Sequence, residues 1–141
     1  MSRTHFPAIA HWNAHIDRHA TSVEMREWLT NRQSLTLRLM AHCTQFRVQR
    51  LQQQVAPSLP DEFAPIGLFR RANVVERDVL LRCDDVAVVY AHTVLPLSAT
   101  ARQWPLFATL GNRSLGSTLF HDPLVRRGPL EYAQLRASHP L

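Results

Sequence analysis

The fold is decided by the stretch Glu76–Pro96, which reads ERDVLLRCDDVAVVYAHTVLP. Two apolar segments flank Cys83-Asp84-Asp85, a pattern that predicts two β-strands joined by a tight turn. Residues two apart share one face of a strand, so Arg77 should lie on the same face as Val79 and Leu81. A buried guanidinium is costly unless an anion or several acceptors meet it. We therefore expect either a carboxylate of the protein or a bound anion beside Arg77.

The register of this hairpin follows from the position of its turn. Counted from a turn centred on Asp84-Asp85, the expected pairs are Arg77 with His92, Val79 with Tyr90 and Leu81 with Val88. Paired residues share a face of the sheet. The expected register therefore places Tyr90 and His92 beside Arg77, either as ligand contacts or as plain cross-strand packing.

The bulk composition is that of a globular protein. The chain has 141 residues, 45% of them hydrophobic and 19% charged, which predicts a single domain of residues 1–141 with one core. The sequence shows no apolar run long enough to span a membrane and no signal-peptide pattern, so we expect a cytoplasmic protein. Cys43 and Cys83 lack a metal or redox spacing and are expected to be reduced, half-buried fillers.

The charge of the chain points to an anionic partner. The net charge is +5, and every base counted with lysine and arginine is an arginine. Such a balance is typical of proteins that bind nucleic acid or a small anion. The arginines form no long run and no aromatic-interleaved basic motif accompanies them. A small anionic ligand is the favoured interpretation, with nucleic-acid binding as the weaker alternative.

Four histidines lie near the N-terminus, at His5, His11, His15 and His19. The last three are four residues apart and would share one face of a helix. Paired histidines at this spacing bind zinc or nickel in some proteins. No nearby cysteine or suitably placed carboxylate completes a metal site, so a solvated terminal helix without metal is the favoured interpretation.

The remaining sequence alternates short helices, strands and proline-containing loops. A capping-box pattern at Thr21 and Glu24 predicts a helix to about Asn31–Arg32, and Ser34 is the expected cap of a second helix. The other expected elements are a strand at 44–53, a loop around Pro57, Pro60 and Pro65, strand character at 66–69, a helical cover at 98–110 that includes Trp104, a tight element at 114–120 and a strand-like segment at 126–135. This order predicts an α+β protein whose antiparallel sheet is covered by short helices.

No nucleophile elbow, phosphate loop, zinc quartet or dinucleotide motif is present. Several segments nevertheless resemble the chorismate pyruvate-lyase (chorismate lyase) family in their order and spacing. They are Ser34-Leu35-Thr36-Leu37-Arg38, Arg77-Asp78-Val79-Leu80-Leu81, Thr93-Val94-Leu95-Pro96-Leu97-Ser98, and Leu110-Gly111 followed by Leu115-Gly116 and Leu119-Phe120.

The resemblance implies a small monomeric protein with an antiparallel β-sheet, helical flaps and an internal, water-poor ligand site. It also implies conversion of chorismate to 4-hydroxybenzoate and pyruvate without a cofactor, the first step of ubiquinone biosynthesis. By position, Leu35 and Leu115 match ligand contacts on the two flaps. Arg77 matches the arginine that binds the substrate carboxylate and carries catalysis.

One part of the family pattern is missing. The family has a glutamate in a final strand near its C-terminus, and the sequence ends before reaching it, so we expect a truncated chain or one without full activity. The same fold resembles the effector-binding half of certain bacterial transcription regulators, which leaves a non-catalytic module binding an aromatic carboxylate as the alternative. A structural Arg77 neutralised by Glu76 or Glu131 also remains open.

Overall fold

The structure is a computed structural model that describes residues 9–100 and 105–141. His5 and Trp104, named above, lie outside the described residues. The contacts of the chain divide it into two compact units. The larger unit, Gln33–Val125, holds the sheet and every candidate ligand-binding residue.

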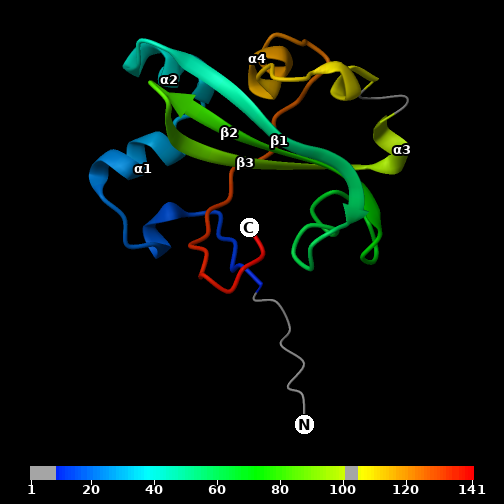
Figure 1. Ribbon diagram of the computed structural model, residues 1–141. Helices are drawn as coiled ribbons and strands as arrows, with labels where there is room; N and C mark the ends of the chain where they lie inside the picture. The colour runs from blue at the N-terminus through cyan, green and yellow to red at the C-terminus, as the bar shows by residue number, and fades with distance from the viewer. Residues whose placement is uncertain (1–8, 101–104) are drawn as a thin grey trace. The chain divides into compact units, whose positions relative to one another are not determined.

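The larger unit is built on a three-stranded antiparallel sheet in the order β1-β2-β3 (Figure 1). The strands are β1 Phe46–Pro57, β2 Asn73–Cys83 and β3 Val86–Pro96. Asp84 and Asp85 join β2 to β3 with positive φ angles of 48° and 64°. Two consecutive positive φ angles are what a tight two-residue hairpin turn requires, and aspartate tolerates them better than most residues. The predicted hairpin and its turn are confirmed.

The expected register of the hairpin is wrong beyond its first two pairs. Cys83 pairs with Val86 and Arg82 with Ala87, but Leu81 then pairs with Val89. Val88 is therefore an extra residue on β3, a β-bulge that shifts all later pairs by one. A shift of one residue exchanges the two faces of a strand.

Two helices lie on one side of this sheet, and a long loop lies on the other (Figure 1). The helices are α2 Leu35–His42 and α4 Leu115–Phe120, which also pack against each other. Each begins after a serine whose hydroxyl oxygen accepts a backbone N–H: Ser34 from Leu37 and Ser114 from Ser117. The predicted cap at Ser34 is confirmed. The loop on the opposite side comprises residues 58–72.

Three segments of the larger unit differ from expectation. In the part of 98–110 that the structure describes, the expected helical cover consists of α3 Leu97–Thr100 and the 3-10 helix η2 Pro105–Thr109. Residues 66–69 form turns and bends, not a strand, and β1 continues to Pro57 instead of ending near Gln53. The first turn of η2 begins at a proline, as the restriction on proline inside helices demands.

The smaller unit contains little regular structure among its described residues. Its elements are η1 Ile16–Arg18 and α1 Val23–Thr30, and a single bridge joins Asn13 to Tyr132. The cap of α1 is Ser22 and not the expected Thr21. The strand expected at 126–135 is reduced to this one bridge, whose backbone hydrogen bonds are 2.8 Å long.

The terminal histidines do not line one helix face, because only a single 3-10 turn separates His15 from His19. His19 instead contacts the backbone carbonyl of Tyr132 through its Nε2, at 3.1 Å. Within residues 9–100 and 105–141, no helix has the length and apolar character needed to span a membrane.

Candidate functional site

Arg77 lies under the helices on the covered face of the sheet and is only 2% exposed. Val79 and Leu81, its neighbours on the same face, are 4% and 7% exposed. The prediction of an arginine among buried apolar side chains is therefore confirmed. On β3 its neighbours are Thr93, which pairs with Arg77, and Ala91, which pairs with Val79. Both side chains are small.

The guanidinium of Arg77 is held by backbone carbonyls. Its Nη2 donates to Gly111 O at 3.0 Å and to Arg113 O at 2.9 Å. Its Nε is buried and has no hydrogen-bond partner, and no carboxylate of the described residues forms an ion pair with it. Glu76 instead accepts a hydrogen bond from Gln54 at 2.8 Å. Neutralisation of Arg77 by Glu76, the structural alternative, is not what the contacts show.

A second arginine adds positive charge on the same face. Arg50 of β1 pairs with Val79, which places its side chain on the face of Arg77. Burial, and then the charge of Arg50, lower the pKa of Arg77 from its ordinary value. Two cations that share a face without a carboxylate between them favour the binding of an anion.

Gln53 is the polar residue that sequence reasoning missed. It pairs directly with Arg77, and its Nε2 donates to the Phe107 carbonyl at 3.2 Å. This bond fixes the orientation of the amide and leaves Oε1 buried without a partner. An unpaired acceptor thus lies on the strand position next to the unpaired Nε of Arg77. No sequence signal marked Gln53, because β1 was expected to end there.

The starts of α2 and α4 meet above this face. The hydroxyls of Thr36 and Ser114 are hydrogen-bonded at 2.7 Å, although the residues are far apart in the sequence. Leu35 and Leu115 are the first residues of the two helices, and the first N–H of a helix has no acceptor within it. Since Arg77 bonds the carbonyl of Arg113, directly before Ser114, all three predicted site residues belong to one neighbourhood.

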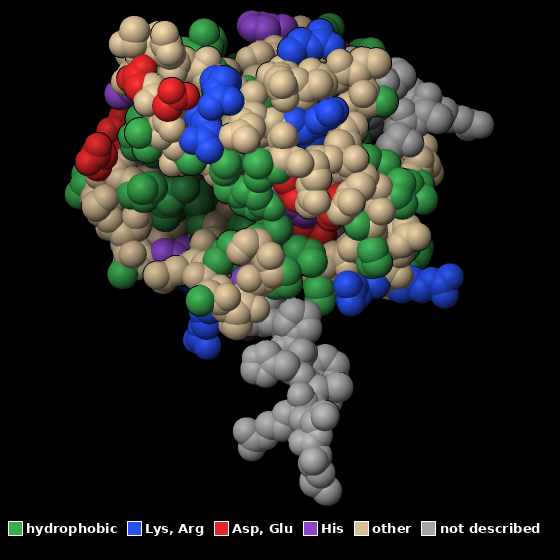
Figure 2. All heavy atoms as spheres, viewed as in Figure 1, with side chains coloured by type: hydrophobic (Ala, Val, Ile, Leu, Met, Phe, Trp, Pro, Cys, Tyr) green, Lys and Arg blue, Asp and Glu red, His purple; other side chains and the backbone are tan. Residues whose placement is uncertain are grey.

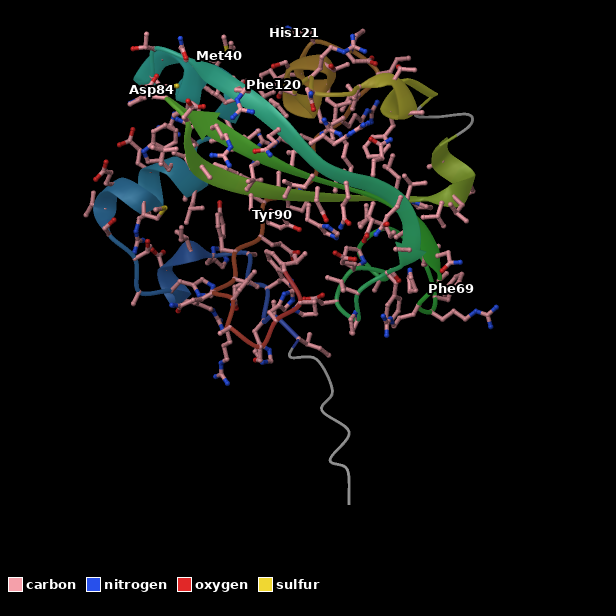
Figure 3. All side chains as sticks on the ribbon, in the orientation of Figure 1. Met40, Phe69, Asp84, Tyr90, Phe120 and His121 are labelled. Atoms are coloured by element: carbon pink, nitrogen blue, oxygen red, sulfur yellow. The ribbon has the colours of Figure 1, made fainter. Side chains whose placement is uncertain are left out.

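The side chains of the two leucines are less enclosed than expected. Leu35 is 40% exposed and Leu115 is half-buried. The two leucines therefore do not form a closed apolar cover, and at each position the backbone N–H lacks an acceptor inside its own helix. In Figure 3, Met40 and Phe120 mark the side of the sheet on which α2 and α4 lie, and Tyr90 marks the opposite side.

A groove of about 550 Å³ runs between β1 and the two helices. Arg77 does not line it, so the groove is adjacent to the arginine and does not enclose it. On the face shown in Figure 2, arginine side chains gather where β1 and α4 lie in Figure 1. The groove is lined by Thr36, Met40, Phe46, Arg47, Val48, Gln49, Arg50, Asn112, Ser114 and Ser117.

The opposite face of the sheet holds a different cluster of charges. Asp78 pairs with His92, and its Oδ1 lies 2.5 Å from His92 Nδ1. Glu62, from the loop of residues 58–72, places Oε1 at 2.5 Å from His92 Nε2. The expectation that His92 and Tyr90 lie beside Arg77 is wrong, because the bulge at Val88 turns both toward this face.

The imidazole of His92 is held between two carboxylates in a buried site. Burial alone would lower its pKa, but the hydrogen bond that the imidazole donates to Asp78 and the charge of Glu62 raise it above its ordinary value. Burial and the nearby Asp78 raise the pKa of Tyr90 to about 12. Asp78 also accepts a hydrogen bond from Gln52. All the charges of this cluster are therefore met by the protein itself.

The described residues contain no group of three or more histidine, cysteine, aspartate or glutamate side chains arranged to hold a metal ion. The polar groups described on the covered face are arginines, amides and backbone groups. These can bind a carboxylate, orient a small ring and keep it away from water.

Comparison with known proteins matches this chain to a family. The family model described as chorismate lyase matches residues 6–140 of the chain. A protein of Cupriavidus metallidurans named "Probable chorismate pyruvate-lyase" is 45% identical over 135 residues, which cover 94% of this chain and 62% of that protein. Proteins with the same name from Nitrosomonas eutropha and Ralstonia nicotianae are 41% and 46% identical, over 84% and 81% of this chain and 67% and 58% of their own length.

Proposed function

The chain belongs to the chorismate lyase family, and we propose that its protein converts chorismate to 4-hydroxybenzoate and pyruvate. The observation that carries the proposal is Arg77, a buried guanidinium without a carboxylate partner in the described residues. Chorismate carries two carboxylates, and an unpaired cation in a low-dielectric site binds such a group strongly. The relatives named above bear the name of this activity.

Arg77 is assigned the substrate carboxylate and the central role in catalysis. Its Nη2 already donates to Gly111 and Arg113, so the buried Nε, which has no partner, is the donor that we assign to the ligand. The N–H groups of Leu35 and Leu115, at the starts of α2 and α4, are assigned as further ligand contacts. The carbonyl bonds give Arg77 a second task, since they position the loop that leads into α4.

The reaction requires little covalent chemistry from the protein. Loss of pyruvate leaves an aromatic ring, so much of the driving force lies in the substrate. The covered face must orient chorismate, exclude water and stabilise negative charge on the departing enolpyruvyl group. Arg77, with Arg50 nearby, supplies positive charge for this purpose, and neither a covalent intermediate nor a cofactor is part of the proposal.

The product is also an aromatic carboxylate. In this proposal Arg77 holds 4-hydroxybenzoate as it holds chorismate. We therefore propose that product release is slow and that 4-hydroxybenzoate inhibits the enzyme. We further propose that the enzyme is monomeric and cytoplasmic and that its product, 4-hydroxybenzoate, enters ubiquinone biosynthesis.

The chain spans 62% of the length of the Cupriavidus metallidurans relative over the matched region. The activity of the whole protein is therefore tested on the protein expressed from its complete coding sequence. A coding sequence that continues beyond Leu141 into an apolar strand with a glutamate would supply the acid that the family pattern contains.

The decisive assay incubates that protein with chorismate and follows 4-hydroxybenzoate and pyruvate together. Equal amounts of the two products support the proposed lyase. Tight binding of 4-hydroxybenzoate with no turnover by a folded protein would favour the non-catalytic binding module instead. If neither result is obtained and the protein binds nucleic acid in a strongly salt-dependent way, nucleic-acid binding would explain the basic charge instead.

A further inference from the structure

The two cysteines of the chain meet in space, although forty residues separate them. Cys43 directly follows α2, and Cys83 is the last residue of β2. Their Sγ atoms are 2.6 Å apart, and both thiols are free and half-buried. Each sulfur also faces the carbonyl of Leu39, at 3.1 Å from Cys43 and 3.7 Å from Cys83. The spacing of the two cysteines in the sequence did not predict this contact.

The backbone around the two cysteines is held in place by the hairpin turn. The carboxylate of Asp84 accepts the N–H of Thr44 at 3.0 Å and the N–H of Gln45 at 2.8 Å. The N–H of Asp84 donates in return to Gln45 O at 2.8 Å. These bonds join the residues after Cys43 to the residue after Cys83. They hold together the two backbone segments that carry the cysteines.

We propose that Cys43 and Cys83 are a thiol–disulfide pair that, once oxidised, ties the end of α2 to the β2–β3 hairpin. The oxidant is a low-molecular-weight disulfide such as glutathione disulfide. One protein thiolate attacks it, forms a mixed disulfide and releases one glutathione, which takes up a proton. The second protein thiolate attacks the protein sulfur of the mixed disulfide and releases the other glutathione. Two protein thiols are oxidised and one glutathione disulfide is reduced.

The surroundings of the pair set the rate of this reaction. The hydrogen bond to Cys83, burial and the charges of Cys83 and Asp84 raise the pKa of Cys43 to about 11. The thiolate is the reacting form, so oxidation is slow at neutral pH and accelerates as the pH rises. A slow, selective reaction of this kind responds to sustained oxidation.

The bond would act on the helix that begins at Leu35. It closes a loop of the chain between residues 43 and 83, and a loop of that length stabilises the folded state by limiting the unfolded chain. We expect the melting temperature of the oxidised protein to rise by about 10 °C. Backbone amides of α2 should exchange with solvent several-fold more slowly, because the end of the helix no longer separates from the sheet.

The test oxidises the reduced, folded protein with excess glutathione disulfide at alkaline pH and measures its intact mass. The proposal predicts loss of two hydrogen atoms, no alkylatable thiol at residues 43 and 83, and reversal by dithiothreitol. The variants Cys43→Ser and Cys83→Ser serve as matched controls and should each stop at a mixed disulfide with glutathione. Two stable glutathione adducts on the parent protein, or thiols that remain alkylatable, would overturn the proposal. An unchanged melting temperature in the disulfide form would overturn its action on α2.

Discussion

The two faces of β2 differ in whether the protein provides partners for their buried charges. On the covered face, Arg77 meets only backbone carbonyls and the repulsion of Arg50, and its Nε has no partner. On the other face, one residue along, Asp78 meets His92, which in turn meets Glu62. The protein completes the second cluster and leaves the first incomplete. Buried charges that lack a partner are costly to retain, so the incomplete face is the one to which we assign the ligand.

This difference also separates stability from function. The cluster around His92 joins the loop of residues 58–72 to the sheet, and its disruption should appear as lost stability. The cation on the covered face should contribute to ligand binding and little to folding. A change to the His92 face should therefore lower stability, and a change to the Arg77 face should weaken ligand binding. A single change that does both would contradict this distinction between the two faces.

The largest effect on stability is expected for His92→Ala. This change leaves Asp78 and Glu62 buried without their cation, and removal of one partner from a buried ionic cluster costs about 3–5 kcal/mol. Urea-induced unfolding should show a loss of that size. A triple variant that adds Asp78→Asn and Glu62→Gln carries no buried charge and should recover most of it. A single variant as stable as the parent would mean that this cluster does not hold the loop.

Arg77→Met should have the largest effect on binding. The ligand carboxylate loses its charged donor, so affinity for 4-hydroxybenzoate should fall by about 30-fold or more, equivalent to about 2 kcal/mol. Isothermal titration calorimetry measures this directly. Arg77→Lys, the matched control, keeps the charge without the planar guanidinium. Its affinity for 4-hydroxybenzoate should lie between those of the parent and the methionine variant. Equal affinity of parent and methionine variant would remove Arg77 from the site.

A smaller effect is expected at the junction of the two helices. Ser114→Ala removes the cap of α4 and the hydroxyl contact to Thr36, which together should lower the free energy of unfolding by about 1 kcal/mol. Chemical denaturation resolves a change of this size. Ser98→Ala, on an exposed position of α3, is the control and should change stability little. If both variants behave alike, the Thr36 contact does not join the helices in solution.

The smallest expected effect is a dependence of stability on pH. Because the pKa of His92 is raised in the folded state, the folded protein holds this proton more tightly than the unfolded chain. The stabilisation is complete below about pH 6.5, the ordinary histidine value, and declines as the pH rises through the elevated pKa. Unfolding measured from pH 6 to pH 9 should show this decline in the parent. The triple variant should not show this decline. If its stability declines with pH as that of the parent does, other titrating groups cause the decline.

The sequence was sufficient for the features that depend on local pattern. Alternation along β2 placed Arg77 on a buried face with Val79, and the aspartate pair identified the hairpin turn. Ser34 was recognisable as a cap because a serine before an apolar helix is a strong local signal. Each of these features depends on residues that are neighbours in the chain.

Features that depend on the partner strand were not accessible in this way. The bulge at Val88 has no residue signature, since valine is an ordinary strand residue, and it reversed the expected placement of His92. The contact of Cys43 with Cys83 and the pairing of Gln53 with Arg77 arise only when distant segments meet. The expectation that Leu35 and Leu115 contact a ligand came from the family resemblance and not from local chemistry.

The bulge at Val88 has a further consequence for how this protein tolerates change. It sets the phase of β3, so every residue from Val89 onward presents its side chain according to this one extra position. Deletion of Val88 would remove the bulge and keep the observed pairs, Leu81 with Val89 and Asp78 with His92. One residue inserted between Val89 and His92 would instead shift the later pairs, bring an imidazole beside the lone cation and leave two acids without it. A gain of one codon there would thus exchange the side chains that face the two sides of the sheet, whereas a loss of the Val88 codon would leave them where they are.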